Sequence, residues 1–188
     1  APSDDAAVQS LLADLGTGLD RISQTIAAVK AFARDDEVGT FGFVDVTDEL
    51  RGAIAIARPT LPEGARLIEK LRTDGLALRS MPGQLRQAVT NLLSNAVEAT
   101  AARGAETQIT VYAKAIEGRL MVSVTDNGVG LSPAAEASAF KAFYTTRGKG
   151  LGLGLHLVDR FATRQGGQVR VVSASSPTIV EFSLPLKA

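Results

Sequence analysis

The feature that most constrains the fold is a long helical segment followed at once by a hairpin of two strands. Apolar residues recur at helical spacing from about Pro82 to Arg103, with proline in the first turn and Gly104 just past the end. The next residues alternate from 108 to 116, turn at Glu117-Gly118, and alternate again from 119 to 125. A helix that leads directly into an antiparallel pair indicates that helices and strands share one hydrophobic core.

The remainder of residues 39–188 repeats this grouping of strands and helices. We expect strands at 41–46, 65–71, 76–79, 168–174 and 178–184, helices at 47–58 and 151–165, and an irregular stretch with one short helix at 127–150. Thr47 is the predicted N-cap of the first of these helices. The pattern predicts an α/β fold, a two-layer α/β sandwich in which helices cover one face of one mixed sheet.

A separate long helix is predicted over residues 4–34. Its apolar residues follow a heptad stripe: Val8, Leu12, Leu15, Leu19, Ile22, Ile26 and Val29. A stripe this narrow is typical of a helical bundle or coiled coil; packing of the helix on its own domain is the alternative. We therefore divide the chain into a helical segment, residues 1–38, that needs a partner helix, and a globular domain, residues 39–188.

Composition excludes several classes of function. The chain has 20 Lys and Arg against 20 Asp and Glu, so its net charge gives no reason to expect nucleic acid or an anionic membrane as a partner. It has no cysteine and one histidine, which excludes disulfides and sites with several histidine or cysteine ligands. No apolar run is long enough to cross a membrane. Because the chain begins with Ala1 and not with Met, we expect it to be a segment of a larger protein. We expect this segment to be cytoplasmic, and we leave open a membrane anchor elsewhere in the parent protein.

Two asparagines stand one turn apart on the predicted helix, in "NLLSNAVEAT". Asn91 and Asn95 therefore share one face, while Leu85, Val89, Leu92, Leu93 and Ala96 form the opposite, core-facing side. Asparagine lowers helix propensity, so the pair needs a reason. A solvated polar face is the ordinary one. The functional alternative is an amide oxygen that binds Mg²⁺, an ion that takes few protein ligands and keeps its waters.

Two glycine-rich segments follow. "DNGVG" ends a predicted strand; Asp126 could accept a hydrogen bond from a base, although such a sequence is often only a turn. In "FKAFYTTRGKGLGLGL", the glycines lead straight into a helix, whose first amides and positive dipole end favour phosphate. The run matches neither the phosphate-binding loop that ends in Gly-Lys-Ser/Thr nor the dinucleotide fingerprint.

In their order and spacing these segments resemble the sensor histidine kinases of bacterial two-component systems, within the ATPase family shared with DNA gyrase and MutL. "QLRQAVTNLLSNAVEAT" resembles the asparagine box, "DNGVGLSP" the first glycine box, "AFKAFYTTR" the phenylalanine box and "GKGLGLGLHLV" the second glycine box. "LDRISQTIAAVKAFAR" resembles the second helix of the dimerisation and phosphoacceptor hairpin. The "TTR" and "NAVEA" forms resemble the nitrogen-regulation type.

The resemblance implies a Bergerat-type ATP-binding fold and a set of site residues. Asn95 would coordinate Mg²⁺ and Asn91 would orient the phosphates, with Arg147 steadying the terminal one. Asp126 would accept from the adenine amino group. The remaining residues implied to contact ATP are Gly128 and Gly130 in the adenine pocket, Phe143, Thr145, Thr146 and Lys149 in the lid, and Gly150, Leu151, Gly152, Leu153, Gly154 and Leu155 around the phosphates.

The implied reaction is transfer of the ATP γ-phosphoryl group to a histidine on a helix that this chain lacks, and then to an aspartate of a response regulator receiver domain. The full-length protein would form a homodimer through the N-terminal helix, and this fragment alone would not phosphorylate itself. His156, fixed within the ATP domain, is interpreted as a structural residue. Asn91 occupies the place where hydrolysing relatives carry a glutamate, and asparagine cannot act as the base for water. The alternatives are a nucleotide-binding scaffold, a serine kinase of the anti-sigma type and an ATPase.

Overall fold

The computed structural model describes residues 8–9, 12, 40–101, 107–146 and 150–186. The predicted N-terminal helix and the segment 1–38 therefore lie almost wholly outside the described residues. The exceptions are Val8, Gln9 and Leu12, which are helical and exposed. The domain boundary at residue 38 stays a prediction. Within the described part of the chain, no helix is long and apolar enough to cross a membrane.

The main sheet has five strands in the order β2-β4-β5-β7-β6. These strands are β2 (Arg66–Arg72), β4 (Gln108–Ile116), β5 (Arg119–Asp126), β7 (Thr178–Pro185) and β6 (Gln168–Ser173). Strands β2 and β4 are parallel and the other neighbours are antiparallel. The predicted mixed sheet and the hairpin of β4 and β5 are thus confirmed.

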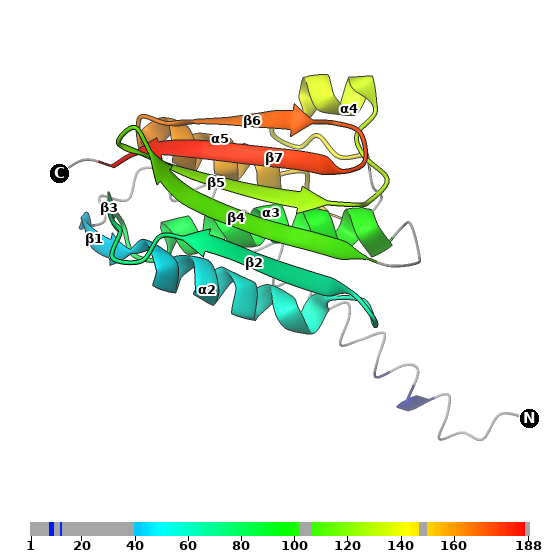
Figure 1. Cartoon of the computed structure of the whole chain (residues 1–188). Coiled ribbons are helices and arrows are strands. Elements are labelled where there is room, and N and C mark those ends of the chain that lie inside the picture. The colour runs from blue at the N-terminus through cyan, green and yellow to red at the C-terminus, as the bar shows by residue number, and fades with distance from the viewer. Residues whose placement is uncertain (1–7, 10–11, 13–39, 102–106, 147–149, 187–188) are drawn as a thin grey trace, which may run out of the picture.

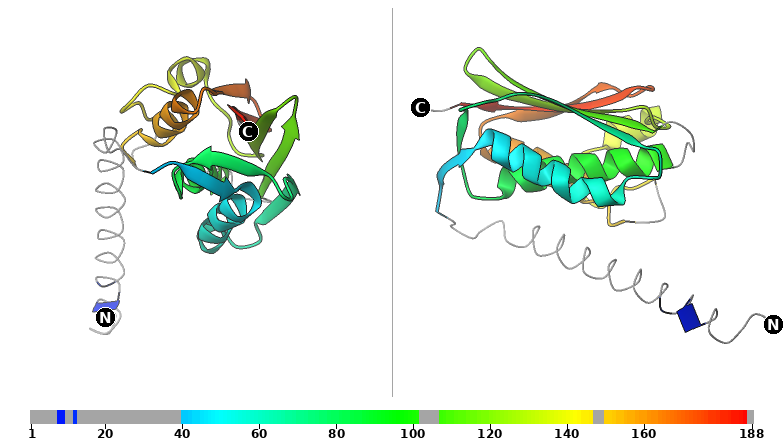
Figure 2. Two further views of the ribbon diagram at one scale, coloured as in Figure 1. Left: turned by 90° about the vertical axis from the view of Figure 1, so that its left-hand side faces the viewer. Right: turned by 60° about the horizontal axis from the view of Figure 1, so that its bottom comes forward.

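Three helices form the second layer. They are α2 (Val46–Ala57), α3 (Gln84–Ala101) and α5 (Gly154–Arg164), and all three lie on the same face of the sheet (Figures 1 and 2). A short helix, α4 (Pro133–Ser138), stands at one end of the sheet, beyond β6. The opposite face of the sheet is covered by no described element, as the two-layer prediction requires.

The prediction of one sheet is wrong for two strands. Strands β1 (Gly42–Asp45) and β3 (Ala77–Ser80) pair with each other in a separate antiparallel ribbon. A turn between β2 and β3 redirects the chain, with Leu76 N donating to Thr73 O at 3.0 Å. The carbonyl of Leu76 then accepts from Val46 N, so the ribbon leads into the start of α2.

The predicted N-cap of α2 is also wrong. Asp45 caps the helix instead, its carboxylate accepting from Asp48 N at 2.9 Å. Thr47 is buried, and its hydroxyl hydrogen-bonds to that of Thr73 at 2.8 Å. Both residue types favour the cap position, and the tertiary partner of Thr47 decides between them.

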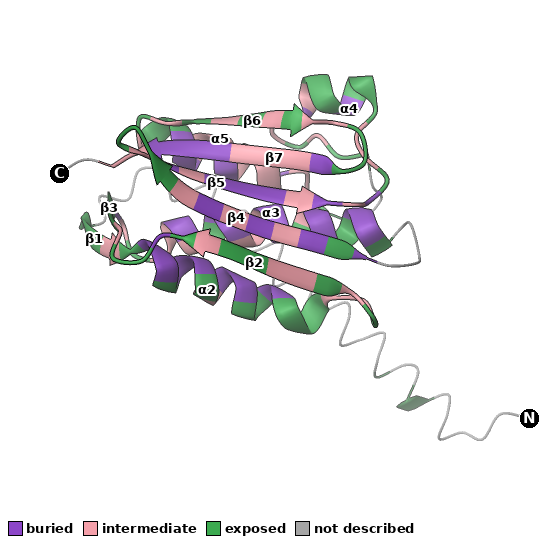
Figure 3. Ribbon diagram, viewed as in Figure 1, coloured by how far each residue is buried: buried purple, intermediate pink, exposed green. Residues whose placement is uncertain are grey.

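The core fills the space between the sheet and α3 (Figure 3). The predicted apolar side of α3 is confirmed, because its members are 0–2% exposed: Leu85, Val89, Leu92, Leu93 and Ala96. From the sheet, Phe182 is fully buried and meets Phe161 of α5 edge to face, with ring centroids 6.1 Å apart. Burial of each large apolar side chain contributes about 1.5–3 kcal/mol, so this layer is the main source of stability.

A buried carboxylate fixes α3 against α2. Glu49 of α2 is 6% exposed and accepts from the backbone N of Arg86 at 3.2 Å and from its Nη2 at 2.7 Å. Arg86 lies in the first turn of α3, where amides have no partner within the helix. Glu49 therefore acts as a cap supplied by another helix, and it positions the helix that carries both asparagines.

Candidate functional site

The two asparagines of α3 face the start of α5. Asn91 donates from Nδ2 to the carbonyl of Gly154 at 3.4 Å and accepts at Oδ1 from Gln87 at 3.1 Å. A Cβ atom on Gly154 would lie 3.7 Å from Nδ2 of Asn95 and 4.0 Å from Cβ of Asn91. The helix of the asparagine box and the end of the second glycine box are therefore in direct contact. This contact brings the amide side chains beside the N-terminus of α5.

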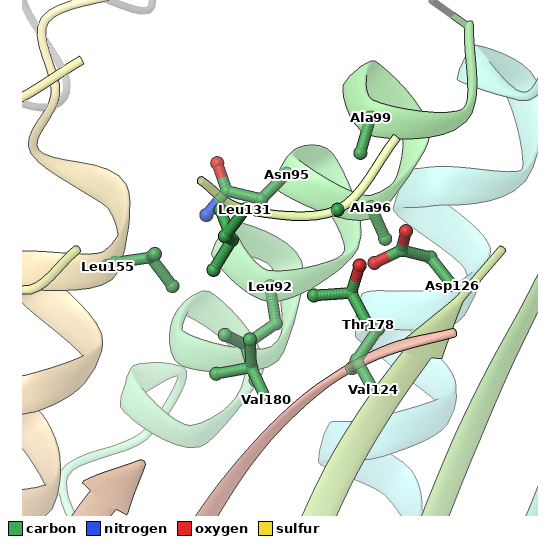
Figure 4. A pocket seen from close by; sticks show the side chains of 11 residues that line it. Leu92, Asn95, Ala96, Ala99, Val124, Asp126, Leu131, Leu155, Thr178 and Val180 are labelled. Atoms are coloured by element: carbon green, nitrogen blue, oxygen red, sulfur yellow. The ribbon is translucent and has the colours of Figure 1, made fainter. Parts of the chain in front are cut away.

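A pocket lies between α3, the ends of β5 and β7, and the beginning of α5 (Figure 4). Its lining residues are Leu92, Asn95, Ala96, Ala99, Val124, Asp126, Gly130, Leu131, Leu155, Thr178 and Val180. Most of these are apolar, and the polar side chains are few. An apolar pocket with a few placed polar groups is typical of a site for a small organic ligand.

Asp126 and Thr178 form the polar end of this pocket. They are directly paired in the ladder of β5 and β7, and both are nearly buried, at 6% and 5% exposed. The Oδ1 atom of Asp126 accepts from Gly128 N at 2.8 Å, which fixes the carboxylate. Oγ1 of Thr178 has no hydrogen-bond partner among the described residues. A buried hydroxyl without a partner is costly, so its position points to a ligand or water that would occupy the pocket.

Thr178 was missed by the sequence analysis. Its strand was predicted from alternation alone, and a threonine at the start of a strand is unremarkable in sequence. Only the register of β7 against β5 places this residue opposite Asp126. The one available indication was that Thr178 takes a core-facing position, two residues before Val180, where an apolar side chain is expected.

The glycines of "DNGVG" are explained by close packing of backbones. A Cβ on Gly128 would lie 2.7 Å from the carbonyl of Ala99, the residue whose oxygen accepts from Val129 N. Gly130 has φ +79°, and a Cβ there would lie 2.8 Å from the oxygen of Ala174. The loop is thus held between the end of α3 and the loop after β6. Gly130 lines the pocket, whereas Gly128 lies outside the lining and packs against the carbonyl of Ala99.

Residues 140–144 lie against the start of α5 and the glycines that precede it. Nδ1 of His156 hydrogen-bonds to the carbonyl of Phe140 at 3.0 Å, which is a structural contact between α5 and this segment. Gly152 has φ +65°, and a Cβ on it would lie 2.6 Å from the carbonyl carbon of Tyr144. A glycine is therefore needed where the second glycine box crosses the phenylalanine box.

The structure brings some of the predicted site residues together and leaves others apart. Asn95, Asp126, Gly130 and Leu155 line the pocket, and Asn91 and Gly154 adjoin it. Phe143, Thr145 and Thr146 are exposed and do not line it; Phe143 is 63% exposed, with φ 63°. Gly150, Leu151, Gly152 and Leu153 form the approach to α5. Arg147 and Lys149 lie outside the described residues.

The arrangement suits a nucleotide with a bound cation. Asp126 and Thr178 provide hydrogen-bonding groups for a nucleotide base between apolar walls. The amides at the start of α5 can bind phosphate. The described residues contain no group of three or more His, Cys, Asp or Glu side chains that could hold a metal. The amide of Asn95 suits a cation held largely by phosphate and water, as Mg²⁺ is in nucleotide sites.

Comparisons with known proteins agree with this geometry. The family model described as "Histidine kinase-, DNA gyrase B-, and HSP90-like ATPase" matches residues 81–188. The chain is 33% identical over 156 residues to the histidine protein kinase DivJ of Caulobacter vibrioides, covering 73% of this chain and 26% of DivJ. It is 35% identical over 113 residues to the sensory histidine kinase/phosphatase NtrB of Rhodobacter capsulatus, covering 55% of this chain and 32% of NtrB. It therefore spans at most a third of either relative.

Solved structures show the same fold. Full-length ShkA in complex with AMPPNP superposes with a TM-score of 0.77 at 29% identity, over 96% of this chain and 39% of ShkA. The mycobacterial sensor histidine kinase MprB gives a TM-score of 0.67 at 23% identity, over 77% of this chain and 97% of the MprB chain. The likeness to MprB shows the fold alone.

Proposed function

Because the chain belongs to the histidine kinase-, DNA gyrase B- and HSP90-like ATPase family, we propose that it is the ATP-binding kinase module of a sensor histidine kinase. The observation that carries the proposal is the pocket itself. It has Asp126 and Thr178 at one end, where the Thr178 hydroxyl has no partner among the described residues, and Asn95 at the other end, beside the start of α5. A base at the first end and phosphates at the second would satisfy both.

Each residue has a proposed role. Asp126 would accept from the amino group of adenine, and Thr178 would complete the polar recognition of the base. Asn95 would be the protein ligand of Mg²⁺, and Asn91 would orient the phosphates with the amides at the start of α5. The lid residues Arg147 and Lys149 would add positive charge around the terminal phosphate. The glycines of the two glycine boxes and the other lid residues would make the remaining contacts with ATP.

The proposed reaction transfers the γ-phosphoryl group of ATP to an imidazole nitrogen of a histidine on another helix, with ADP as the leaving group. Such a transfer needs positioning and neutralisation of charge more than it needs a base in the ATP site. Asn91 fits that chemistry, because its amide cannot take a proton from water. A response regulator aspartate would receive the phosphoryl group, and the parent protein would dimerise through the N-terminal helix.

Calorimetric titration with ATP, with and without Mg²⁺, tests the nucleotide site. Asp126→Ala should weaken ATP and ADP alike, because both carry adenine. Asn95→Ala should remove the gain from Mg²⁺ while leaving Mg²⁺-free binding nearly unchanged. Ser94→Ala is the matched control, since Ser94 is an exposed neighbour on α3 outside the pocket. Absence of nucleotide binding, or equal behaviour of all three variants, would contradict the proposal.

Two further assays separate the kinase from its alternatives. Mixed with the separately produced histidine-bearing helical hairpin of a related kinase and Mg-ATP, the chain should yield acid-labile phosphohistidine. A nucleotide-binding scaffold would bind ATP and give none. An ATPase would instead release phosphate steadily without any acceptor. We expect no such release, because the amide of Asn91 cannot act as a base for water.

A further inference from the structure

The face of the sheet opposite the helices carries an excess of positive charge. Leu67 and Leu71 of β2 pack against the core, so the residues that alternate with them point to the uncovered face. By the same alternation, the cationic residues on this face are Arg66, Lys70 and Arg72 of β2, Lys114 of β4, Arg119 of β5 and Arg170 of β6. Among the five described strands of this sheet, the only carboxylate on the uncovered face is Glu181. Since the chain as a whole has 20 charges of each sign, this segregation is local.

Two of these cations already have partners on the face. Arg170 pairs with Glu181 at 2.8 Å, and Arg119 donates to the hydroxyl of Ser183 at 3.0 Å. The others form what we call the basic patch: Arg66, Lys70, Arg72 and Lys114. None of these four forms an ion pair with a carboxylate in the described ranges.

The basic patch contains a like-charge pair. Arg72 and Lys114 are directly opposite in the ladder of β2 and β4, and like charges so placed repel each other. Lys114 Nζ lies 5.7 Å from the centre of the Tyr112 ring, and Tyr112 is in turn opposite Lys70. The patch is therefore continuous across two strands and includes one aromatic ring.

Protection of a sheet edge explains only part of this charge. Charged side chains on edge strands prevent pairing with other sheets, and β2 is an edge strand. Strand β4, however, is flanked by β2 and β5. Lys114 therefore has no edge to protect, and it adds to the repulsion on its neighbour. A negatively charged group bound at the patch would remove that repulsion.

We propose that the basic patch binds an acidic, extended segment of a partner protein that lies along β2. Side chains that share a face of a strand recur about every 6.6 Å, so alternate carboxylates of such a segment would match the alternate cations of β2. Among the described strands, β2 is hydrogen-bonded to β4 alone, and its other edge is where the segment would add as a strand.

The surroundings of the patch favour a short segment over a broad anionic surface. Glu63 and Asp74 are exposed in the loops before and after β2, and Glu117 is exposed at the turn beyond Lys114. These carboxylates would repel a bilayer or a nucleic acid duplex laid across the face. The nucleotide pocket is lined by α3, α5 and the core-facing side chains of β5 and β7, so the acidic segment and ATP should bind without competition.

The test is fluorescence anisotropy of the whole chain with a fluorescein-labelled peptide, Glu-Val-Glu-Val-Glu-Val-Glu. The double variant Lys70→Gln, Lys114→Gln should bind this peptide about tenfold more weakly. Arg51→Gln, Arg79→Gln is the matched control: it removes two exposed cations from other surfaces and should stay within twofold of the wild type. The affinity should fall with added salt and be unchanged by ATP.

Several results would overturn the proposal. They are absence of peptide binding, equal binding of the corresponding Lys-Val peptide, and equal losses in the two double variants. Tighter binding of a DNA duplex or of anionic phosphatidylserine vesicles, lost in the patch variant, would assign the surface to another class of partner. Thermal unfolding of both variants checks their folding, and Arg66→Gln, Arg72→Gln provides a second patch variant that should show the same loss.

Discussion

Replacement of Thr178 by valine should make the protein more stable and its nucleotide binding weaker. Valine keeps the shape of threonine and removes only the hydroxyl. That hydroxyl is buried, in a residue 5% exposed, and has no protein partner in the described part of the chain. A buried hydroxyl without a hydrogen bond costs about 1–3 kcal/mol in mutational data, so its removal should raise the free energy of unfolding by up to that amount. For a domain of this size each kcal/mol shifts Tm by about 2–4 °C.

The nucleotide affinity should change in the opposite direction. If the hydroxyl bonds to the base or to a water beside it, its loss removes a hydrogen bond with a net value of about 0.5–1.5 kcal/mol. That value corresponds to binding weakened about two- to tenfold. Differential scanning calorimetry without nucleotide and titration with ADP measure the two effects on the same samples.

Thr125→Val is the matched control for this experiment. Thr125 lies on the neighbouring strand β5, on the outer face of the sheet and away from the pocket. It should change neither Tm nor ADP affinity by more than the experimental error. A lower Tm for Thr178→Val would show that the hydroxyl is satisfied within the protein, and unchanged ADP affinity would show that it does not face the base. Either result refutes the reasoning.

Two further variants test the supports of the site. Gly152→Ala should lower the free energy of unfolding in urea more than Gly118→Ala does. Both glycines have positive φ, which costs alanine about 1–2 kcal/mol of backbone strain. Only the Cβ added at Gly152 would also clash with backbone, that of Tyr144. Equal costs would show that this crossing relaxes freely. Glu49→Ala should lower the unfolding free energy by about 1–2 kcal/mol, since it removes the cap of α3 and leaves the half-exposed Arg86 unpaired; a loss below about 0.5 kcal/mol would contradict that assignment.

Features encoded within a few neighbouring residues were predictable from the sequence. The buried side of α3 follows from helical spacing, and each predicted member of it is buried. The turn at Glu117 and Gly118 has φ values of 50° and 73°, as a two-residue hairpin connection requires. The predicted start of α3 at Pro82 was early by two residues, because Gly83, with φ 79°, precedes the first helical turn.

Features that depend on the pairing of distant strands were not predictable. The place of Thr178 beside Asp126 depends on the register of β7 against β5, and a shift by one residue would turn the hydroxyl outward. Alternation could not show that β1 and β3 leave the main sheet either, since both strands have ordinary patterns. Gly128 was predicted to shape the adenine pocket and Gly152 to contact the phosphates, whereas their close contacts with other backbones appear only in three dimensions.

The position of β7 within the sheet has a consequence for synthesis of the protein. Strand β7 is the last of the described strands along the chain, yet it lies between β5 and β6 in the sheet. During translation, therefore, β6 emerges before the neighbour that joins it to the sheet, and β5 keeps one open side until β7 arrives. Because β7 also carries Thr178, the nucleotide pocket is completed only in the last stage of folding. A nascent chain that ends before β7 should have no site for ATP and should expose strand edges that chaperones recognise.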